Sequence, residues 1–567
     1  MLAGLIIFSF GRACLFYYLF ADKIIFPIYF FISTTIEIAI ILWIQSLLFC
    51  VANSRLRILL AALLAFWVFF IYSADFIFYF ESGRHINFEL LTQLDPIALY
   101  FIKVGAKEHW LFLIAGLLIL AVPMFNQALF SIFERASKAW ISGAVILPIA
   151  YWFAGENLFI NNPIYNLYIS AAERTLPQYI RSDFSKSIKI SKETIEYNEA
   201  SFIESRFPFI RKTIASGPPK SSNIVLIILE SWSAYYTQKE IGNTEVTPQF
   251  NMICKKGLCF TRAYATGNRT ANGIISILLG FPDLPQKSLT KTGHSKINFK
   301  PLPLIMKQNG FSTTFLSTGN LEFERLLPFM EKWGFDEVID RSNFSEVAGD
   351  KELYARIAVQ MAKQKEPYFI AALTSTSHFP YHDKPDMVEK FDVSTENHRY
   401  LNSLYHADTL LGKFIKNAKT NNTIFIFISD HTSHRGLNFH DARHIPMAVY
   451  SPGQFNPENI EGITSQLDLI PLVLRLLNLK TEFSAMGKNP LGHQGYAFFA
   501  FGSIYGSVER DGIFFNNYRL NSPGLFLSPD GQKNKCGDIR AKSFCLNLNR
   551  RNLAFLNAYT YVIESGL

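Results

Sequence analysis

The sequence predicts an α/β protein in two parts: an N-terminal bundle of five membrane-spanning helices and a C-terminal domain built on a mostly parallel sheet. Two observations support this. Long apolar runs fill residues 1–157, and short apolar strands alternate with helical segments in 223–567. Strands that are apolar on both sides are typical of a central sheet covered by helices on both faces. The intervening residues, 158–222, are expected to form a linker.

The composition supports the membrane part. Of the 567 residues, 49% are hydrophobic and only 18% are charged, whereas a soluble chain has about 25% charged residues. Each apolar run approaches or exceeds the roughly 20 residues that a helix needs to cross a bilayer. The first run lacks a basic start and a clear small-residue cleavage site, so we interpret it as a span rather than a signal peptide. The five predicted spans cover about 2–20, 24–51, 58–80, 110–128 and 139–155.

The charge pattern predicts the orientation and argues against one class of partner. Short loops after the second and fourth spans carry the basic pairs Arg55/Arg57 and Arg135/Lys138. Positive loops favour the inner side, so we expect an inside N-terminus and an outer C-terminal domain. Residues 1–157 are net neutral, so the whole net charge of +8 is spread over 158–567, without a basic helix or RNP-like motif. Nucleic acid is therefore not the predicted partner.

The linker over 158–222 has helical periodicity and several basic residues, which predicts an amphipathic juxtamembrane segment. It ends in the turn-rich stretch 216–222, Ser-Gly-Pro-Pro-Lys-Ser-Ser. The strands predicted beyond it are Asn223–Leu229, Thr313–Ser317, Tyr368–Leu373, Thr423–Ser429 and Pro446–Tyr450.

Polar side chains follow several of these strands where the strands end. Glu230 follows the first strand, and Asp430 and His431 follow the fourth. Thr270 lies in a loop at a predicted helix N-terminus. Ligands of such sheets bind beyond the carboxyl ends of the strands, so we expect these residues to share one edge.

This residue set suits metal-assisted phosphoryl chemistry. Glu230, Asp430 and His431 provide two carboxylates and an imidazole for one divalent cation, and the Thr270 hydroxyl completes four-coordination. Coordination lowers the pKa of a hydroxyl and turns it into a nucleophile near neutral pH. A helix N-terminus beside it favours an anionic substrate such as phosphate. Taken singly, each residue also fits an ordinary cap or turn, so the prediction depends on their conjunction.

Two further histidines are candidates for the same site. His378 follows the third strand, and His444 precedes the fifth. Either could orient phosphoryl oxygens or transfer protons to attacking and leaving oxygens.

At these residues the sequence resembles the membrane-anchored phosphotransferases of the alkaline phosphatase superfamily, which include lipoteichoic acid synthases and phosphoethanolamine transferases. The similar motifs are 223–231 around Glu230, the Thr270 loop, 377–381 (Ser-His-Phe-Pro-Tyr), 428–431 (Ile-Ser-Asp-His) and 444–447 (His-Ile-Pro-Met). The resemblance implies a Mn²⁺ or Zn²⁺ ion held by Glu230, Thr270, Asp430 and His431, with Thr270 as the nucleophile. It also implies headgroup contacts from Phe323 and Arg325, and from His378.

Two departures qualify the resemblance. The family has glycine after the Asp-His pair, whereas Thr432 stands here, which implies a different local turn. Sulfatases of the superfamily need a Cys-x-Pro-x-Arg motif or its serine equivalent, and the stretch from Cys259 to Arg262 has neither the proline nor the spacing. The sequence therefore disfavours a sulfatase.

The cysteines of the C-terminal domain bear on the compartment. Cys254 and Cys259 lie five apart, and Cys536 and Cys545 nine apart. Two local disulfides would suit an oxidising periplasm. Zinc binding by the four thiolates is the alternative, although neither spacing is typical of a zinc ribbon.

The resulting functional hypothesis is transfer of phosphoglycerol from a membrane phospholipid to a hydroxyl of an envelope glycan or lipid, through a phosphothreonine intermediate. The predicted location is the inner (plasma) membrane, multi-pass, with the catalytic domain outside the cytoplasm. Phosphoethanolamine transfer, to lipid A or another envelope glycan, is the first alternative, and a phosphodiesterase releasing headgroups to water is the second. A non-catalytic membrane scaffold is a third, more remote one.

Overall fold

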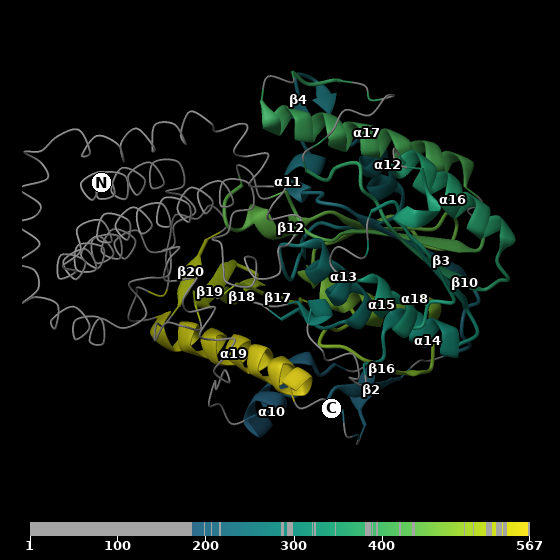
Figure 1. Ribbon diagram of the computed structural model, residues 1–567. Helices are drawn as coiled ribbons and strands as arrows, with labels where there is room; N and C mark the ends of the chain where they lie inside the picture. Colours follow the sequence, from purple (N-terminus) through teal and green to yellow (C-terminus); the bar gives the residue numbers. More distant parts are fainter. Residues whose placement is uncertain are drawn as a thin grey trace, which may run out of the picture. The chain divides into compact units, whose positions relative to one another are not determined.

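The computed structural model describes the C-terminal part of the chain (Figure 1). All described residues belong to the second of two compact units, which begins at Arg181. The five predicted spans and the first part of the linker lie outside them. None of the helices in the described part combines the length and the hydropathy needed to cross a membrane. The described residues run from 184 to 564, except 198, 204, 206, 215–216, 285–287, 292–298, 320, 322–324, 346–347, 380, 382–386, 388, 393–394, 419–420, 434–436, 493, 503, 518–523, 529–535 and 537–540.

An eight-stranded sheet forms the centre of this domain, with the strand order β14-β6-β13-β11-β3-β10-β8-β9. Pairing is parallel except where β13 meets its two neighbours, β11 and β6. The predicted mostly parallel sheet is thereby confirmed. The strands are β3 (Asn223–Leu229), β6 (Leu258–Phe260), β8 (Ser312–Ser317), β9 (Glu337–Ile339), β10 (Tyr368–Leu373), β11 (Thr423–Ser429), β13 (Met447–Tyr450) and β14 (Glu458–Ile460).

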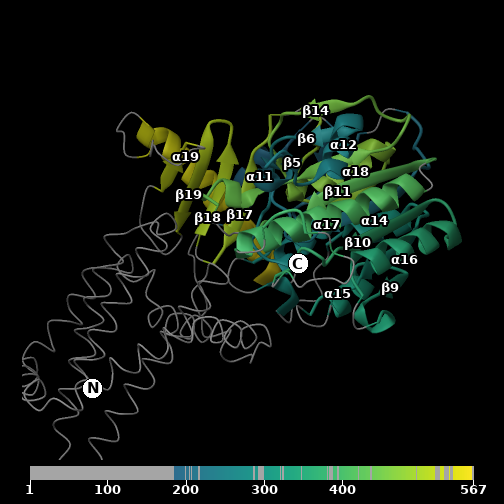
Figure 2. The ribbon, with the colours of Figure 1, turned by 90° about the horizontal axis from the view of Figure 1, so that it is seen from above.

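Helices cover both faces of the sheet, as Figures 1 and 2 show. Every residue of β3 is buried. Its side chains alternate between two cores: Ile224, Leu226 and Ile228 pack into one, and Val225 and Ile227 into the other. This alternation explains why the strand must be apolar throughout. The first face carries α13 (Thr270–Leu279), α14 (Leu302–Gln308), α15 (Leu327–Lys332) and α18 (Leu469–Leu477), and the second carries α12 (Pro248–Lys256), α16 (Asp350–Lys363) and α17 (Glu396–Asn417).

A second, four-stranded antiparallel sheet follows in the chain and was not predicted. Its strands are β17 (Ala497–Phe501), β18 (Ile504–Glu509), β19 (Gly512–Asn517) and β20 (Leu525–Leu527), in that order. The long helix α19 (Lys542–Glu564) packs on β18 and β19. α10 (Phe184–Ile195) packs against α19 in turn, with the rings of Phe184 and Tyr561 stacked 4.7 Å apart. Smaller elements are α11 (Ala234–Thr237), β4 (Glu240–Ile241), β5 (Thr244–Glu245), β7 (Ala263–Tyr264), β12 (His444–Ile445) and β15 (Thr464–Ser465), with the 3-10 helices η3 (Leu289–Lys291), η4 (Arg341–Asn343), η5 (Asp441–Arg443) and η6 (Gln466–Asp468).

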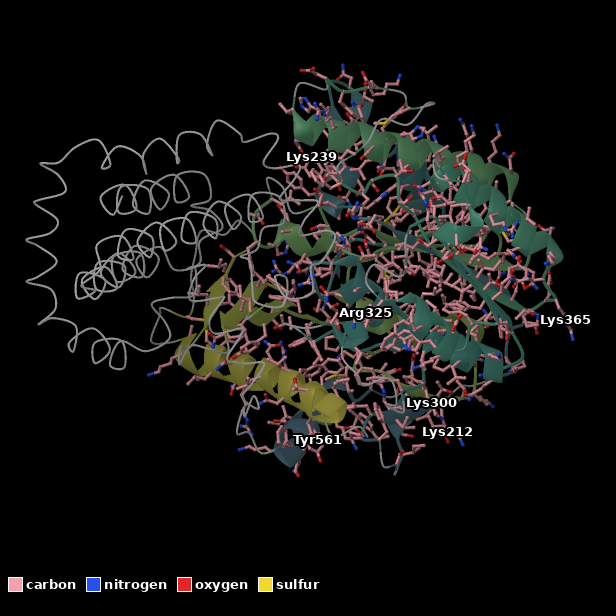
Figure 3. All side chains as sticks on the ribbon, viewed as in Figure 1. Lys212, Lys239, Lys300, Arg325, Lys365 and Tyr561 are labelled. Carbon is pink, nitrogen blue, oxygen red and sulfur yellow. A yellow bond between two sulfur atoms is a disulfide. The ribbon has the colours of Figure 1, made fainter. Side chains whose placement is uncertain are left out.

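The folded part of the chain extends upstream of the predicted boundary at 223. β2 (Ile210–Thr213) pairs with β1 (Ala200–Phe202) on one side and with β16 (Glu482–Ser484) on the other. The fully buried Arg211 anchors this small sheet by donating hydrogen bonds to the carbonyls of Ile195, Ala485 and Gly487. Lysines such as Lys212 and Lys365 lie at the rim of the domain and point outward (Figure 3).

We expect Arg211→Met to lower the free energy of unfolding by about 2–4 kcal/mol, because three buried carbonyls lose their donor. The adjacent, exposed Lys212 is the matched control, and Lys212→Met is expected to change that free energy by less than about 0.5 kcal/mol. Urea unfolding of the full chain measures both values. Equal effects of the two substitutions would contradict the anchoring role of Arg211.

Candidate active site

The predicted site residues lie at the carboxyl ends of two neighbouring strands. β3 and β11 pair in parallel, with Leu229 opposite Ser429. The residues that follow, Glu230 and Asp430, are therefore held side by side, and both are buried. Thr270 is the first residue of α13. The sheet register and one helix terminus together assemble the cluster.

The side-chain atoms of the cluster lie within a few ångströms of one another. The Thr270 hydroxyl is 3.3 Å from Glu230 Oε2 and 3.4 Å from His431 Nε2. His431 Nε2 is also 3.4 Å from Glu230 Oε1 and 3.5 Å from Asp430 Oδ2. One ligand atom from each of Glu230, Asp430 and His431 falls within a 4.8 Å span. All four predicted ligands are thus brought together.

The hydrogen bonds around the cluster fit a divalent cation. Asp430 Oδ1 accepts from the backbone N–H groups of Ser231 and His431, at 2.9 and 2.8 Å. Its other oxygen, Oδ2, is buried and accepts no hydrogen bond from any described residue. His431 Nδ1 lies 3.0 Å from the carbonyl of Thr432. Donation to that carbonyl would keep a proton on Nδ1 when a cation is bound, so that Nε2, the nitrogen that faces the carboxylates, could give its lone pair to the ion. Two carboxylates, an imidazole and a hydroxyl suit a single divalent ion.

The protonation states of the cation-free cluster reflect its crowded charges. Burial and the neighbouring charge of Glu230 raise the pKa of Asp430 to about 8. Burial lowers the pKa of His431, but the charges of Asp430 and Glu230 outweigh it and raise that pKa to about 10. Burial also raises the pKa of Glu230, but its hydrogen bond to His431 and the charges of His378 and His431 bring it down to about 2. Without a cation, protons on Asp430 and His431 therefore offset the negative charge of the two carboxyl groups.

Ser231 supports the cluster and was not singled out from the sequence. Its backbone has a φ of 59°, in the left-handed region that few residues other than glycine adopt. In that conformation its N–H faces Asp430, and its hydroxyl donates to Glu230 Oε1 at 2.8 Å. Its carbonyl accepts from the hydroxyl of Tyr400 at 2.6 Å. The only signal in the sequence was its place directly after Glu230.

His378 lies beside the cluster. Its side chain is exposed in the turn after β10, and its charge is one of the causes that lower the pKa of Glu230. The preceding Ser377 is buried and donates a hydrogen bond from its hydroxyl to the Glu230 carbonyl, at 2.6 Å. The turn that carries His378 is thereby fixed to the end of β3.

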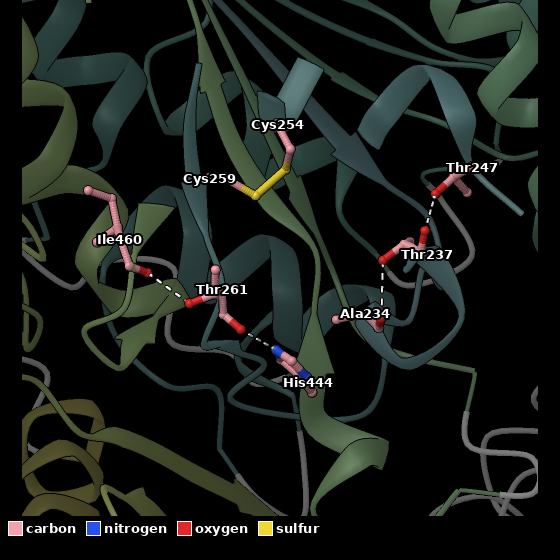
Figure 4. Close-up of a disulfide and its surroundings, with 8 residues drawn as sticks. All are labelled: Ala234, Thr237, Thr247, Cys254, Cys259, Thr261, His444 and Ile460. Atoms are coloured by element: carbon pink, nitrogen blue, oxygen red, sulfur yellow. Dashed lines mark hydrogen bonds between the residues drawn. A yellow bond between two sulfur atoms is a disulfide. The ribbon is translucent and has the colours of Figure 1, made fainter. Parts of the chain in front are cut away.

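His444 is oriented differently from what we expected of a catalytic residue. Its Nε2–H donates to the carbonyl of Thr261 at 2.9 Å (Figure 4). Its ring stacks on that of Tyr264, with the ring centroids 5.1 Å apart. Burial lowers its pKa to about 4. With the Cys254–Cys259 disulfide, it lines a cavity of about 290 Å³. Among the described residues no contact joins His444 to the cluster, so its catalytic role stays a prediction.

The two predicted headgroup contacts have different outcomes. Phe323 lies outside the described residues. Arg325 is exposed between β8 and α15, with a φ of 54° (Figure 3). No contact between its side chain and the cluster is present in the described part of the chain, so its role also stays a prediction.

The departure at Thr432 has a structural explanation. The side chain is buried, and its hydroxyl donates to the carbonyl of Ala442 at 2.6 Å. This bond ties the loop after β11 to the segment that leads into β12. A glycine could not form it.

The cysteines are paired as disulfides. Cys254, near the end of α12, is bonded to Cys259 in β6 (Figure 4). Cys536 is bonded to Cys545 in α19. The first bond joins a helix to the strand that follows it. Zinc binding by these four thiolates is inconsistent with this pairing.

Comparison with known proteins addresses the family. Residues 222–479 match the family model described as Sulfatase. The matched region is a little under half of the 567-residue chain. The match includes Glu230, Thr270, Asp430 and His431.

The lipoteichoic acid synthase-like YvgJ of Bacillus subtilis is 23% identical over 342 residues, which are 53% of each chain. The lipoteichoic acid synthase of Staphylococcus saprophyticus is 22% identical over 305 residues, 47% of each chain.

The chain therefore spans about half the length of the curated relatives it matches. Two solved structures share the fold of the C-terminal domain. One is a protein in the alkaline phosphatase superfamily from Vibrio parahaemolyticus, with a TM-score of 0.59, 22% identity and coverage of 68% of this chain and 97% of that one. The other is the lipoteichoic acid synthase LtaP from Listeria monocytogenes, with a TM-score of 0.55, 19% identity and coverage of 67% and 98%. The predicted alkaline-phosphatase-like fold is confirmed.

Gly273 permits the close approach of α13 to the cluster, which gives a test of the site. A Cβ atom at this position would lie 2.3 Å from the carbonyl oxygen of Asp430. We expect Gly273→Ala to push the helix away and to weaken Mn²⁺ binding at least about tenfold, as disturbed ligand positioning typically does. Gly319→Ala is the control, because its Cβ would meet nothing closer than 3.3 Å. Calorimetric titration with Mn²⁺ measures both, and unchanged affinity in Gly273→Ala would refute the close contact.

Cation binding is also expected to release protons. Asp430, with a pKa of about 8, and His431, with a pKa of about 10, hold protons at neutral pH when no cation is bound. These protons compete with the cation, so its apparent affinity should increase as pH rises toward those values. Titration in two buffers with different ionisation enthalpies should give different heats. Equal heats would show that the ligands are already deprotonated.

Proposed function

We propose that this protein is a phosphotransferase that moves a phosphoglycerol headgroup from a membrane phospholipid to a hydroxyl of an envelope glycan or lipid. The observation that carries the proposal is the Thr270 hydroxyl at the start of a helix, 3.3 Å from Glu230 and 3.4 Å from His431. A hydroxyl in that position is a nucleophile rather than a surface group. The relatives named lipoteichoic acid synthase support the phosphoglycerol assignment.

In the first step, Thr270 Oγ1 forms a bond to the phosphorus of the lipid headgroup, and the bond from phosphorus to the diacylglycerol oxygen breaks. The hydroxyl proton leaves along the hydrogen bond to Glu230 Oε2, while the diacylglycerol oxygen takes up a proton. His378, exposed beside Glu230, is the group we assign to proton transfer with the leaving oxygen. The product of this step is a phosphodiester on Thr270.

In the second step, an acceptor hydroxyl attacks the same phosphorus, and the bond to Thr270 Oγ1 breaks. The proton of the acceptor hydroxyl returns to Thr270 by way of the same residues. Backbone N–H groups in the first turn of α13 favour the anionic phosphodiester throughout. Attack by water instead would make the protein a phosphodiesterase, which is the hydrolytic alternative.

Glu230, Asp430, His431 and Thr270 would hold one divalent cation, which we propose to be Mn²⁺ or Zn²⁺. Such an ion lowers the pKa of the attacking hydroxyl and stabilises charge on the phosphoryl oxygens. The buried Asp430 Oδ2, which accepts no hydrogen bond from a described residue, supports this proposal.

The proposed membrane location follows from the substrate. A lipid donor and the departing diacylglycerol both stay in the bilayer, so an anchor over 1–157 would hold the domain at the surface where they lie. We place the domain on the outer side, where its two disulfides are stable. The paired cysteines and the 377–381 stretch also keep phosphoethanolamine transfer as the second candidate.

Mass spectrometry of the tryptic peptide from Thr270 to Lys287 distinguishes these functions. After incubation with phosphatidylglycerol, we expect a phosphoglycerol adduct on Thr270. A phosphoethanolamine adduct formed from phosphatidylethanolamine alone would favour the second candidate. We expect Thr270→Ala to abolish both the adduct and transfer, with at least about a thousandfold loss of activity because the covalent route is removed.

The control is Thr409→Ala on α17, where the lost hydroxyl contacts only the Tyr405 carbonyl among the interactions of the structure's described part. This variant should retain full activity. Full headgroup transfer by Thr270→Ala would contradict the assignment of Thr270 as the nucleophile.

A further inference from the structure

Gln466 is a buried polar residue that the proposed mechanism does not use. It is the first residue of η6, in the short turn between β15 and α18, and its side chain is fully buried. A buried amide costs free energy unless its donors and acceptors are satisfied, so its partners indicate what it does.

The two ends of this amide bond to two different parts of the active site. Its Nε2 group donates to the carbonyls of Ser429 and Asp430, at 2.8 and 2.7 Å. Its Oε1 accepts from the backbone N–H of Thr266 at 3.0 Å and from the Thr266 hydroxyl at 3.1 Å. The assignment of nitrogen and oxygen is unambiguous, because both partners on one side are acceptors and both on the other side are donors.

The Thr266 end belongs to the loop that carries the nucleophile. Thr266 lies four residues before Thr270, and its hydroxyl also lies 2.5 Å from that of Ser276, inside α13. Its carbonyl accepts from the backbone N–H of Ala500 in β17 at 2.9 Å. The loop is therefore fixed on three sides, and Gln466 provides the side that faces the metal ligands.

The other end holds the backbone of a predicted ligand. The Asp430 carbonyl that accepts from Gln466 is the same atom that approaches Gly273 of α13. Gln466 and the Gly273 contact thus fix two points of the interface between the strand end and the nucleophile helix. A shift of the loop would stretch the two hydrogen bonds of Oε1, and a shift of the strand end would stretch the two of Nε2.

We infer that Gln466 is a positioning residue that sets the placement of Thr270 relative to Asp430 and His431. The inference rests on the proposed function for the identity of the nucleophile, but the bridge itself is a property of the fold. A side chain that only filled the core would need no amide, and methionine would replace it without loss. Glutamate would keep an oxygen that accepts from Thr266. Its second oxygen, however, would face the carbonyl oxygens of Ser429 and Asp430 and would repel them.

The test compares Gln466→Met and Gln466→Glu with Gln360→Met in the full chain. Gln360 is a second buried glutamine, in α16, whose amide bonds to Glu337 away from the cluster. Unfolding midpoints identify loss of stability alone. Calorimetry with Mn²⁺ alone, without lipid, reports the geometry of the ligands, and headgroup transfer gives kcat and KM.

We expect Gln466→Met to weaken Mn²⁺ binding about tenfold and to lower kcat by about ten- to a hundredfold, with KM changed less than about twofold. Gln466→Glu should be more severe in both measurements. Gln360→Met, with a similar loss of unfolding midpoint, should leave Mn²⁺ affinity and kcat within about twofold of the unsubstituted protein. Mn²⁺ affinity and kcat that change no more in Gln466→Met than in Gln360→Met would overturn the inference.

A double-mutant cycle tests the bridge directly. If Gln466 acts through the loop, the effects of Thr266→Val and Gln466→Met on Mn²⁺ affinity are non-additive, because they remove the same connection. Additive effects would count against the bridge. If the unsubstituted protein transfers no headgroup but the Mn²⁺ measurements follow this pattern, the proposed function fails while the positioning role stands.

Discussion

The placement of two buried carboxylates side by side is the constraint on which the rest of the site depends. The parallel register of β3 and β11 fixes Glu230 and Asp430 as neighbours. Two like charges in a buried place repel each other, and each loses hydration. The surrounding groups offset this in part: the imidazole of His431 faces both carboxylates, and the Ser231 N–H donates to Asp430. The site that remains is negatively charged, and Asp430 Oδ2 has no hydrogen-bond donor among the described residues. A cation bound there would neutralise this charge and occupy that oxygen.

The nucleophile is placed by a helix rather than by the sheet, so the two must be joined accurately. α13 reaches Asp430 because Gly273 leaves room for direct backbone contact. Two departures from ordinary structure lie at the same junction: Ser231 has a positive φ, and the buried Asp430 Oδ2 accepts no hydrogen bond from any described residue. Departures of this kind are costly and persist where surrounding structure enforces them, which is typical of functional sites.

The sequence was sufficient to predict five strands of the central sheet and the residues of the cluster, but not the short strands β6, β9 and β14. Strands such as Asn223–Leu229 are apolar on both faces, and polar residues directly after them must lie at the sheet edge. Side-chain direction was harder to predict. The orientation of His444 depends on the pairing of β12 with β7, which places it opposite Tyr264, about 180 residues away in the chain. The role of Ser231 depends on its positive φ, and no pattern of residues in the sequence predicts that backbone conformation. The sheet of β17–β20 was not predicted, although β17 (Ala-Phe-Phe-Ala-Phe) and β19 contain the aromatic residues that favour strands.

That second sheet explains how the irregular segments around the site are held. β17 bonds to the nucleophile loop through the Ala500 N–H. The same strand supplies Phe499 and Phe501, whose rings lie 4.5 Å from the guanidinium of Arg443, while Phe439 lies 3.7 Å away. Burial lowers the pKa of Arg443 to about 9, so the aromatic faces must stabilise the cation in place of water.

Arg443 precedes His444 directly, and its carbonyl accepts from the N–H of Ala265. One strand therefore restrains both the loop before Thr270 and the segment before His444. The C-terminal sheet is thus part of the framework of the active site, although it contributes none of the predicted ligands.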